Sequence, residues 1–297
     1  MEIIVLFGGT SSEREVSITS GKRVAAALAR RGHGVQLFDY RMGGFSEKLL
    51  HQCQRADAVF LALHGGAGED GRLQAALEAE GIYHYTGSGP AASRLAMDKA
   101  AAKACVAGAG VPVPPGAVWL PGAERPPFPY PAVLKPLSGG SSVGVVFAEN
   151  ATRLASFLPT EPMLAEPYLS GAEYTVSVLE GRTLPVVEIR PHGGRYDYEA
   201  KYTSGGALEL CPAPLEPPAS AALQRLALRA WHALSLRDLC RVDFKCDAEG
   251  HPFFLEANTL PGLTATSLLP LAAAADGIPF GELVEKISLL AAGRKRT

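Results

Sequence analysis

The sequence lacks several features that would assign it to a class at once. It has no apolar run of about 18 residues, the length that a membrane-spanning helix requires. Its charges are balanced, with 28 basic and 30 acidic residues and a net charge of -2. No field of one sign is therefore available to attract nucleic acid or an anionic membrane surface. We expect neither a nucleic-acid nor a membrane partner.

Cysteine is scarce and scattered. The five cysteines are odd in number and include no C-x-x-C pair, which argues against a disulfide framework and a zinc site. The apolar stretch at residues 3–7 is too short for the core of a signal peptide, and no basic residue precedes it. These absences predict a reduced, cytoplasmic protein.

Two common phosphate-binding motifs are also missing. The turn Gly8-Gly9-Thr10 does not have the G-x-G-x-x-G spacing of a dinucleotide fold, and no G-x-x-x-x-G-K-[ST] occurs. A Rossmann dehydrogenase and a P-loop NTPase are therefore disfavoured. The glycine- and serine-rich stretch 138–144, close to Lys135, offers backbone N–H groups that could cradle a phosphate. A glycine-rich hairpin without function is the alternative.

The first part of the chain alternates strands and helices, which predicts a parallel α/β domain. Ser12 is a candidate N-cap for the first helix, and Gly32 follows its end. The predicted strands are 3–7, 35–38 and 58–63, and the predicted helices are 13–30 and 73–80.

After residue 92 the pattern changes to hairpins with separate helices, which predicts two α+β regions. A polar loop at 191–214 has the length typical of a functional lid. The other predicted elements are a helix at 93–107, strands at 132–135 and 163–166, a helix at 151–157, a hairpin at 174–179 and 184–189, and a helix at 219–234. The predicted domains are 1–92, 93–169 and 170–297.

The last hairpin carries the most informative side chains. If its turn is centred on Glu249 and Gly250, Asp243 lies opposite Glu256. Because side chains alternate along a strand, Arg241 and Asn258 share their face. Two carboxylates and an amide oxygen suit Mg²⁺. A solvated sheet face is the alternative, since alternating charges are common there.

Three other residues permit two interpretations each. Glu13 lies where a helix N-terminus favours anions, so it is either a helix-stabilising acid or part of a substrate site. His64 follows a parallel strand, where ligands bind in open α/β sheets, but a lone histidine is often structural. Lys99 is either a surface charge or a phosphate ligand.

Together these segments resemble the ATP-grasp superfamily, and within it the D-alanine–D-alanine ligase family. The resemblance covers essentially the whole chain. It is carried by the segments 8–17, 64–71, 85–89, 97–99, 135–136, 140–144, 196–202 and 256–264, in that order.

The resemblance implies an ATP-grasp fold, in which an N-terminal parallel α/β domain is followed by two α+β subdomains that sandwich ATP. It also implies ligation of two D-alanines through an acyl phosphate, for peptidoglycan synthesis, with two Mg²⁺ or Mn²⁺ ions, in a homodimer. The alternatives are a D-alanine–D-lactate or D-serine ligase, another ATP-grasp carboxylate–amine ligase, and a nucleotide-binding descendant without turnover.

The residues that match the family's motifs have implied roles. Those for the nucleotide are Lys99, Lys135, Ser141, Ser142, Glu166, Leu169, Glu173 and Lys201. The metal ligands are Asp243, Glu256 and Asn258. The catalytic residues are Glu13, Ser141, Tyr202, Arg241, Gly262 and Ser267, and the substrate contacts are His64, Lys201, Ser267 and Leu268. Within these sets, Glu13, Ser141 and Tyr202 would form a triad that closes the lid, and Arg241 with the Gly262 N–H would stabilise an oxyanion.

Overall fold

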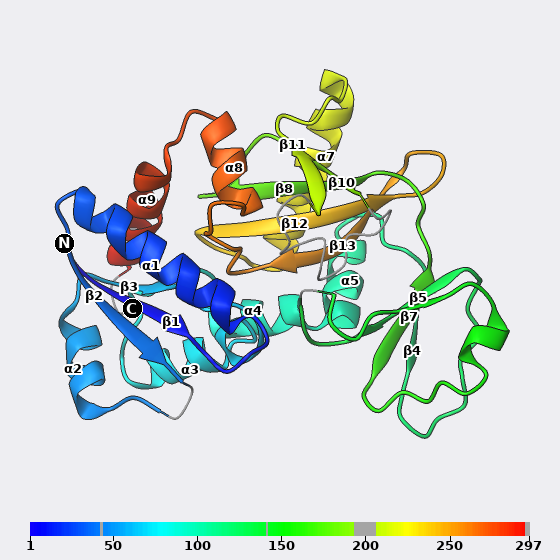
Figure 1. Cartoon of the computed structure of the whole chain (residues 1–297), viewed down its shortest axis with the longest axis horizontal. Helices are drawn as coiled ribbons and strands as arrows, with labels where there is room; N and C mark the ends of the chain where they lie inside the picture. Colours follow the sequence, from blue (N-terminus) through cyan, green and yellow to red (C-terminus); the bar gives the residue numbers. More distant parts are fainter. Residues whose placement is uncertain (42–43, 141, 193–205, 295–297) are drawn as a thin grey trace.

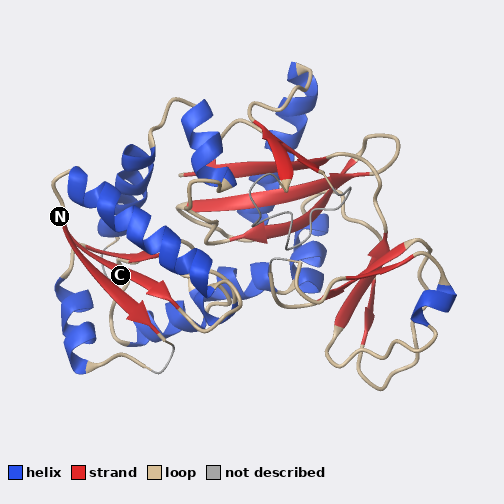
Figure 2. Ribbon diagram, in the orientation of Figure 1, coloured by secondary structure: helices blue, strands red, loops and turns tan. Residues whose placement is uncertain are grey.

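The computed structural model describes residues 1–41, 44–140, 142–192 and 206–294 and has three parts (Figure 1, Figure 2). A parallel sheet with helices lies at one end, a small antiparallel sheet at the other, and a larger antiparallel sheet between them. This mixture of α/β and α+β parts confirms the predicted fold class. No helix in the described ranges is long and apolar enough to cross a membrane.

The parallel sheet has the order β2-β1-β3. Its central strand is buried along most of its length, which explains its uninterrupted apolar sequence. The loops that follow β1 and β3 meet at the carboxyl edge of the sheet. The elements are β1 (Glu2–Gly8), α1 (Arg14–Arg30), β2 (Gly34–Tyr40), α2 (Glu47–Arg55), β3 (Ala58–Leu61), the 3₁₀ turn η1 (Gly66–Gly68) and α3 (Arg72–Ala79).

The start of α1 differs from the prediction. Glu13, not Ser12, occupies the N-cap position. Its neighbour Ser11 donates its hydroxyl to the His64 carbonyl at 2.6 Å and accepts the Glu13 N–H at 3.2 Å. The turn is therefore tied to the loop after β3. At the other end, Gly32 has φ +85°, the left-handed conformation that ends helices, as predicted.

The helix predicted at 93–107 is two helices, α4 (Pro90–Met97) and α5 (Lys99–Gly108). Asp98 separates them because its carboxylate accepts the N–H groups of Ala100 and Ala101, both at 3.0 Å. An aspartate that bonds the backbone in this way caps a new helix. The break places Lys99 in the first turn of α5.

Replacing Asp98 with alanine is expected to lower the free energy of unfolding by about 1 kcal/mol, because the alanine cannot cap α5. Urea denaturation would measure the change. Asp98→Asn retains an acceptor oxygen and is the matched control, so it should lose clearly less. Equal losses in the two variants would contradict the capping role.

The small sheet has the order β4-β7-β5-β6, and all of its pairs are antiparallel. Its outer strands have no counterpart among the predicted elements because each has only three residues. The helix predicted at 151–157 is a single 3₁₀ turn. The elements are β4 (Ala117–Trp119), β5 (Ala132–Pro136), β6 (Val146–Ala148), η2 (Ala151–Leu154) and β7 (Met163–Pro167).

The larger sheet has the order β11-β10-β8-β12-β13, with β9 paired to β8. Part of the loop predicted at 191–214 is a strand, β11, which pairs with β10. The elements are β8 (Glu173–Leu179), β9 (Arg182–Thr183), β10 (Val187–Pro191), β11 (Ala207–Leu210), α7 (Pro217–Ala233), β12 (Leu239–Cys246) and β13 (Pro252–Asn258).

The predicted pairing of Asp243 with Glu256 is confirmed, but two features combine to produce it. Near the turn, Cys246 pairs with Pro252, so the connection is five residues long (247–251) rather than a tight turn at Glu249 and Gly250. A β-bulge between the Asp243 and Phe244 pairs then shifts the register by one residue. Bulges of this kind re-aim side chains next to functional sites.

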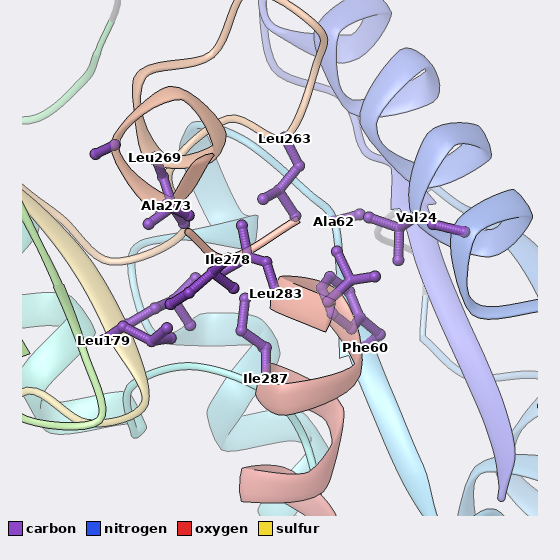
Figure 3. Packing of buried hydrophobic residues seen from close by; sticks show 14 of the residues in the cluster. Val24, Phe60, Ala62, Leu179, Leu263, Leu269, Ala273, Ile278, Leu283 and Ile287 are labelled. Atoms are coloured by element: carbon purple, nitrogen blue, oxygen red, sulfur yellow. The ribbon is translucent and has the colours of Figure 1, made fainter. Parts of the chain in front are cut away.

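The last two helices are α8 (Leu268–Ala275) and α9 (Phe280–Ala292), and α9 packs against α1 and β3 of the N-terminal part of the chain. Figure 3 shows Ile278, Leu283 and Ile287 packed against Phe60 of β3, with Leu179 of β8 on the other side. One apolar cluster thus connects the parallel sheet to the larger antiparallel sheet. The domain boundaries remain a prediction.

Candidate active site

A first cleft lies between the two antiparallel sheets. Its walls include residues of β5 and β7 from the small sheet, and of β12 and β13 from the larger one. Every predicted nucleotide-binding residue in the described ranges lines it, namely Lys99, Lys135, Ser142, Glu166, Leu169 and Glu173. Ser141 and Lys201 lie outside the described residues.

The first cleft combines apolar walls with paired charges. Glu166 is buried and accepts from the Lys135 ammonium at 2.9 Å. Burial alone would raise the pKa of Glu166, but the charges of Lys135 and Lys103 outweigh it and hold this pKa below its ordinary value. Lys245 lies 3.3 Å from Glu173, and Val133, Phe147 and Leu255 supply apolar surface. Apolar walls with a few charged side chains suit a ligand that has a flat aromatic base and an anionic phosphate chain.

A second cleft lies against the carboxyl edge of the parallel sheet. It is lined by all the predicted catalytic and substrate residues in the described ranges, namely Glu13, His64, Arg241, Gly262, Ser267 and Leu268. Tyr202 lies outside them. Glu256 and Gly140 line both clefts, so the two clefts meet at the end of the β12–β13 hairpin.

The candidate metal ligands lie at this junction. Asp243 binds both Arg241 Nε and an Arg241 terminal nitrogen at 2.9 Å, and accepts from Asn258 Nδ2 at 3.0 Å. Glu256 lies 3.5 Å from Lys99 Nζ. Among the described residues, no group of three or more His, Cys, Asp and Glu side chains could hold a metal. Two carboxylates and an amide nonetheless fit Mg²⁺, which completes its shell with water and phosphate oxygens.

His64 is buried and held on both sides. A carbonyl can only accept, so Nδ1 carries the proton that is donated to Leu260 O at 2.9 Å. Nε2 then accepts the Ser20 hydroxyl at 3.0 Å, and Ser20 accepts the Leu263 N–H at 3.3 Å. Burial lowers the pKa of His64, which keeps the ring neutral. His64 thereby positions the loop that contains Gly262.

Glu69 belongs to a motif that the sequence singles out, but its role could not be read from the sequence. The side chain is buried and accepts two backbone N–H groups, from Gly65 at 2.7 Å and from Leu260 at 3.1 Å. It therefore joins the loop after β3 to the loop after β13. Burial, followed by the charge of Glu13, raises the pKa of Glu69 to about 8.

This raised pKa predicts a pH-dependent stability difference between the protein and Glu69→Gln. The pKa of Glu69 rises from 4.5 to about 8 on folding, so its protonation contributes to the stability of the folded protein. This contribution is fully present below pH 4.5 and is lost as the pH rises to about 8. The glutamine of the variant does not titrate but loses one hydrogen bond. The variant should be less stable at pH 5, and the difference should shrink by pH 8 in urea denaturation. Glu80→Gln, at an exposed position, is the control. A difference independent of pH would contradict the assignment.

Two glycines permit close contacts with side chains that line the second cleft. Gly65 has φ +66°, and a Cβ there would lie 2.3 Å from Glu13 Oε2. A Cβ on Gly262 would lie 2.6 Å from Ser267 Oγ. Ser267 occupies the N-cap position of α8, and its hydroxyl accepts the Thr264 N–H at 3.0 Å. The cleft thus contains a carboxylate, which can bind an ammonium group. It also contains a guanidinium and a helix N-terminus, both of which can bind a carboxylate.

The chain is similar to known proteins of one family. The family model described as D-ala D-ala ligase C-terminus matches residues 123–288. A D-alanine–D-alanine ligase from Oleidesulfovibrio alaskensis is 44% identical, with 97% of this chain and 95% of the relative covered. One from Lawsonia intracellularis is 41% identical, with 98% of each covered.

Solved structures agree with these sequence relatives. D-alanine–D-alanine ligase from Bacillus anthracis has a TM-score of 0.84 at 32% identity, with 98% of this chain and 97% of that chain covered. Its complex with ATP has a TM-score of 0.83 at 31% identity, with the same coverage. The VanG D-Ala:D-Ser ligase from Enterococcus faecalis has a TM-score of 0.80 at 27% identity, with 98% and 99% covered.

Proposed function

Because the chain belongs to the D-alanine–D-alanine ligase family, we propose that it joins two D-alanine molecules into D-alanyl-D-alanine for peptidoglycan synthesis in the cytoplasm. ATP is cleaved to ADP and phosphate in the same reaction. The observation that carries this proposal is the meeting of the two clefts at Glu256. A phosphoryl group bound in the first cleft would there face a carboxylate bound in the second.

The first cleft is the proposed ATP site. Glu166 and the backbone of Leu169 would bind the adenine, and Glu173 the ribose hydroxyls. Lys99, Lys135 and the loop that contains Ser141 and Ser142 would bind the phosphates. Lys99 already donates to Gly139 O at 2.6 Å, so its ammonium points toward this loop.

Asp243, Glu256 and Asn258 are the proposed ligands of two Mg²⁺ ions, with Mn²⁺ as a substitute. Such ions neutralise charge on the phosphates. The Asp243 carboxylate also binds the Arg241 guanidinium, so a proposed metal ligand and the proposed oxyanion donor lie side by side.

The second cleft is the proposed amino-acid site. Glu13 would bind the ammonium of the first D-alanine, with His64 nearby. The carboxylate of that D-alanine attacks the γ-phosphorus, ADP leaves, and an acyl phosphate forms. Ser267 and Leu268, at the N-terminus of α8, would hold the carboxylate of the second D-alanine.

In the second step, the amine of the second D-alanine attacks the acyl carbon, loses a proton, and displaces phosphate. Arg241 and the Gly262 N–H would stabilise the oxyanion of the tetrahedral intermediate. Ser141 and Tyr202, with Glu13, would close the lid and exclude water, which would otherwise hydrolyse the acyl phosphate. Lys201 would contact the γ-phosphate. Glu13 lies beside Gly140, the neighbour of Ser141, which supports the proposed triad.

The proposal extends to a homodimer with domains 1–92, 93–169 and 170–297. Sedimentation of the purified protein would test the dimer.

The test of function is phosphate release from Mg²⁺-ATP with D-alanine, alongside L-alanine, D-serine and D-lactate controls. Phosphate that appears only with D-alanine, matched by D-alanyl-D-alanine, is the expected result. A mixed product with D-serine would instead assign the chain to the activity named for the Enterococcus relative. ATP binding without turnover would favour a nucleotide-binding descendant.

A further inference from the structure

Lys103 is a buried lysine that does not itself line the first cleft but pairs with Glu166, which does. It is 5% exposed and Glu166 is 1% exposed, and the Lys103 ammonium pairs with Glu166 Oε1. The ammonium also donates to Phe254 O at 3.2 Å. Lys103 therefore connects α5 to β7 of the small sheet and to β13 of the larger one.

The two oxygens of Glu166 have separate partners. Oε1 is taken by Lys103 from the buried side, and Oε2 lies 2.9 Å from Lys135, which lines the first cleft. Two ammonium groups keep the carboxylate ionised, and an ionised carboxylate can only accept hydrogen bonds. A ligand group that meets Glu166 must therefore be a donor, such as an amine. A carbonyl oxygen would meet a negative charge.

We propose that Lys103 is a positioning residue that makes the first cleft selective for a 6-aminopurine nucleotide. By anchoring Glu166 Oε1, it keeps the carboxylate facing the exocyclic amine of the base. Hypoxanthine and guanine present a 6-oxo group there and are rejected. The inference rests on the proposed function only in placing the base at Glu166.

A purely structural role for Lys103 makes a different prediction. If the lysine only joined the two sheets through Phe254, its loss would weaken the binding of every nucleotide equally. A role through Glu166 changes the ratio between bases instead. Lys103 remains protonated at neutral pH although burial, with the charge of Lys135, lowers its pKa to about 8.

The test is displacement of a fluorescent ADP analogue, in Mg²⁺ and without D-alanine, by ATP, ITP and purine riboside triphosphate, which lacks the 6-amino group. The protein should bind ATP about ten- to a hundredfold more tightly than purine riboside triphosphate, since the acceptor is charged. In Lys103→Met the ratio should fall to about threefold or less. Lys103→Arg, which keeps the charge, should recover part of it.

Lys245→Met is the matched control, because Lys245 also pairs with a glutamate of this cleft, Glu173, at 3.3 Å. It should change affinity for all three nucleotides alike and leave their ratio intact. An unchanged ratio in Lys103→Met, or no discrimination by the unmodified protein, would overturn the proposal.

Glu166→Gln and Lys103→Met/Glu166→Gln settle the point even if Lys103→Met does not fold. The double variant has no carboxylate at position 166, so the loss of Lys103 does not leave a buried carboxylate without its partner. If Lys103 acts only through Glu166, these two variants should have the same ratio between bases, and a difference between them would overturn the inference. Base selectivity without dipeptide formation would refute the proposed ligase activity but leave the role of Lys103 standing.

Discussion

Glu256→Ala is expected to lower the rate of D-alanyl-D-alanine formation about a thousandfold while the protein stays folded. Glu256 lines both clefts and lies opposite Asp243 across the hairpin. Its removal takes away a proposed metal ligand at the point of phosphoryl transfer. Metal neutralisation of transferring phosphate contributes several kcal/mol, and each 1.4 kcal/mol or so is a factor of ten in rate.

The measurement is D-alanine-dependent phosphate release over a range of Mg²⁺ concentrations, with circular dichroism to check the fold. Nucleotide binding without metal should survive, because the substitution removes a negative charge near Lys99. Glu249→Ala, at an exposed turn residue of the same hairpin, is the control and should keep full activity. Full activity in Glu256→Ala would refute the metal assignment.

Arg241→Ala is expected to lower kcat about 10²- to 10³-fold, the usual effect of removing one oxyanion donor. Asp243 holds the guanidinium through two parallel hydrogen bonds, so the donor is fixed before the substrates bind. Asp243 keeps Thr175 and Asn258 as partners in the variant, which should therefore fold. Lysine cannot form the paired bonds, so Arg241→Lys should restore little of the rate.

Steady-state kinetics with saturating ATP would separate kcat from KM. Arg190→Ala is a close control, because Arg190 in the same sheet also forms two bonds to an acid two residues away, Glu188. It should leave kcat unchanged. A loss confined to the KM for D-alanine in Arg241→Ala would contradict the oxyanion role.

Several features of the fold could be predicted because they depend on local sequence. The apolar run of β1 predicted a strand of a parallel sheet that is buried on both faces, and alternation along β12 and β13 placed Arg241, Asp243, Glu256 and Asn258 together. The pairing across that hairpin was predicted correctly, yet it depends on a bulge. The bulge adds one residue to β13, so that Leu255 and Glu256 both line the first cleft, and strict alternation does not predict where such an extra residue falls.

Other predictions failed where a short-range competitor outweighed the pattern. Periodicity predicted one helix at 93–107, but Asp98 bonded the backbone and began a second. Ser12 looked like an N-cap, but the turn was fixed by Ser11 bonding to His64, which lies far away in the sequence. The packing of α9 on the parallel sheet had no local signal, because it depends on which faces meet after folding.

By itself, the sequence determined the family, the elements that carry the motifs, and which side chains share a strand face. These follow from residue spacing, which is local and periodic. Only the tertiary structure decided which titratable groups are buried and what they contact, as in Lys103 behind Glu166 and Glu69 between two loops. The spacing of Lys99 and Lys103 puts both on one helix face, but the elements that pack there make only the second a buried cation. Desolvation depends on neighbours that are distant in the chain, and no spacing rule records them.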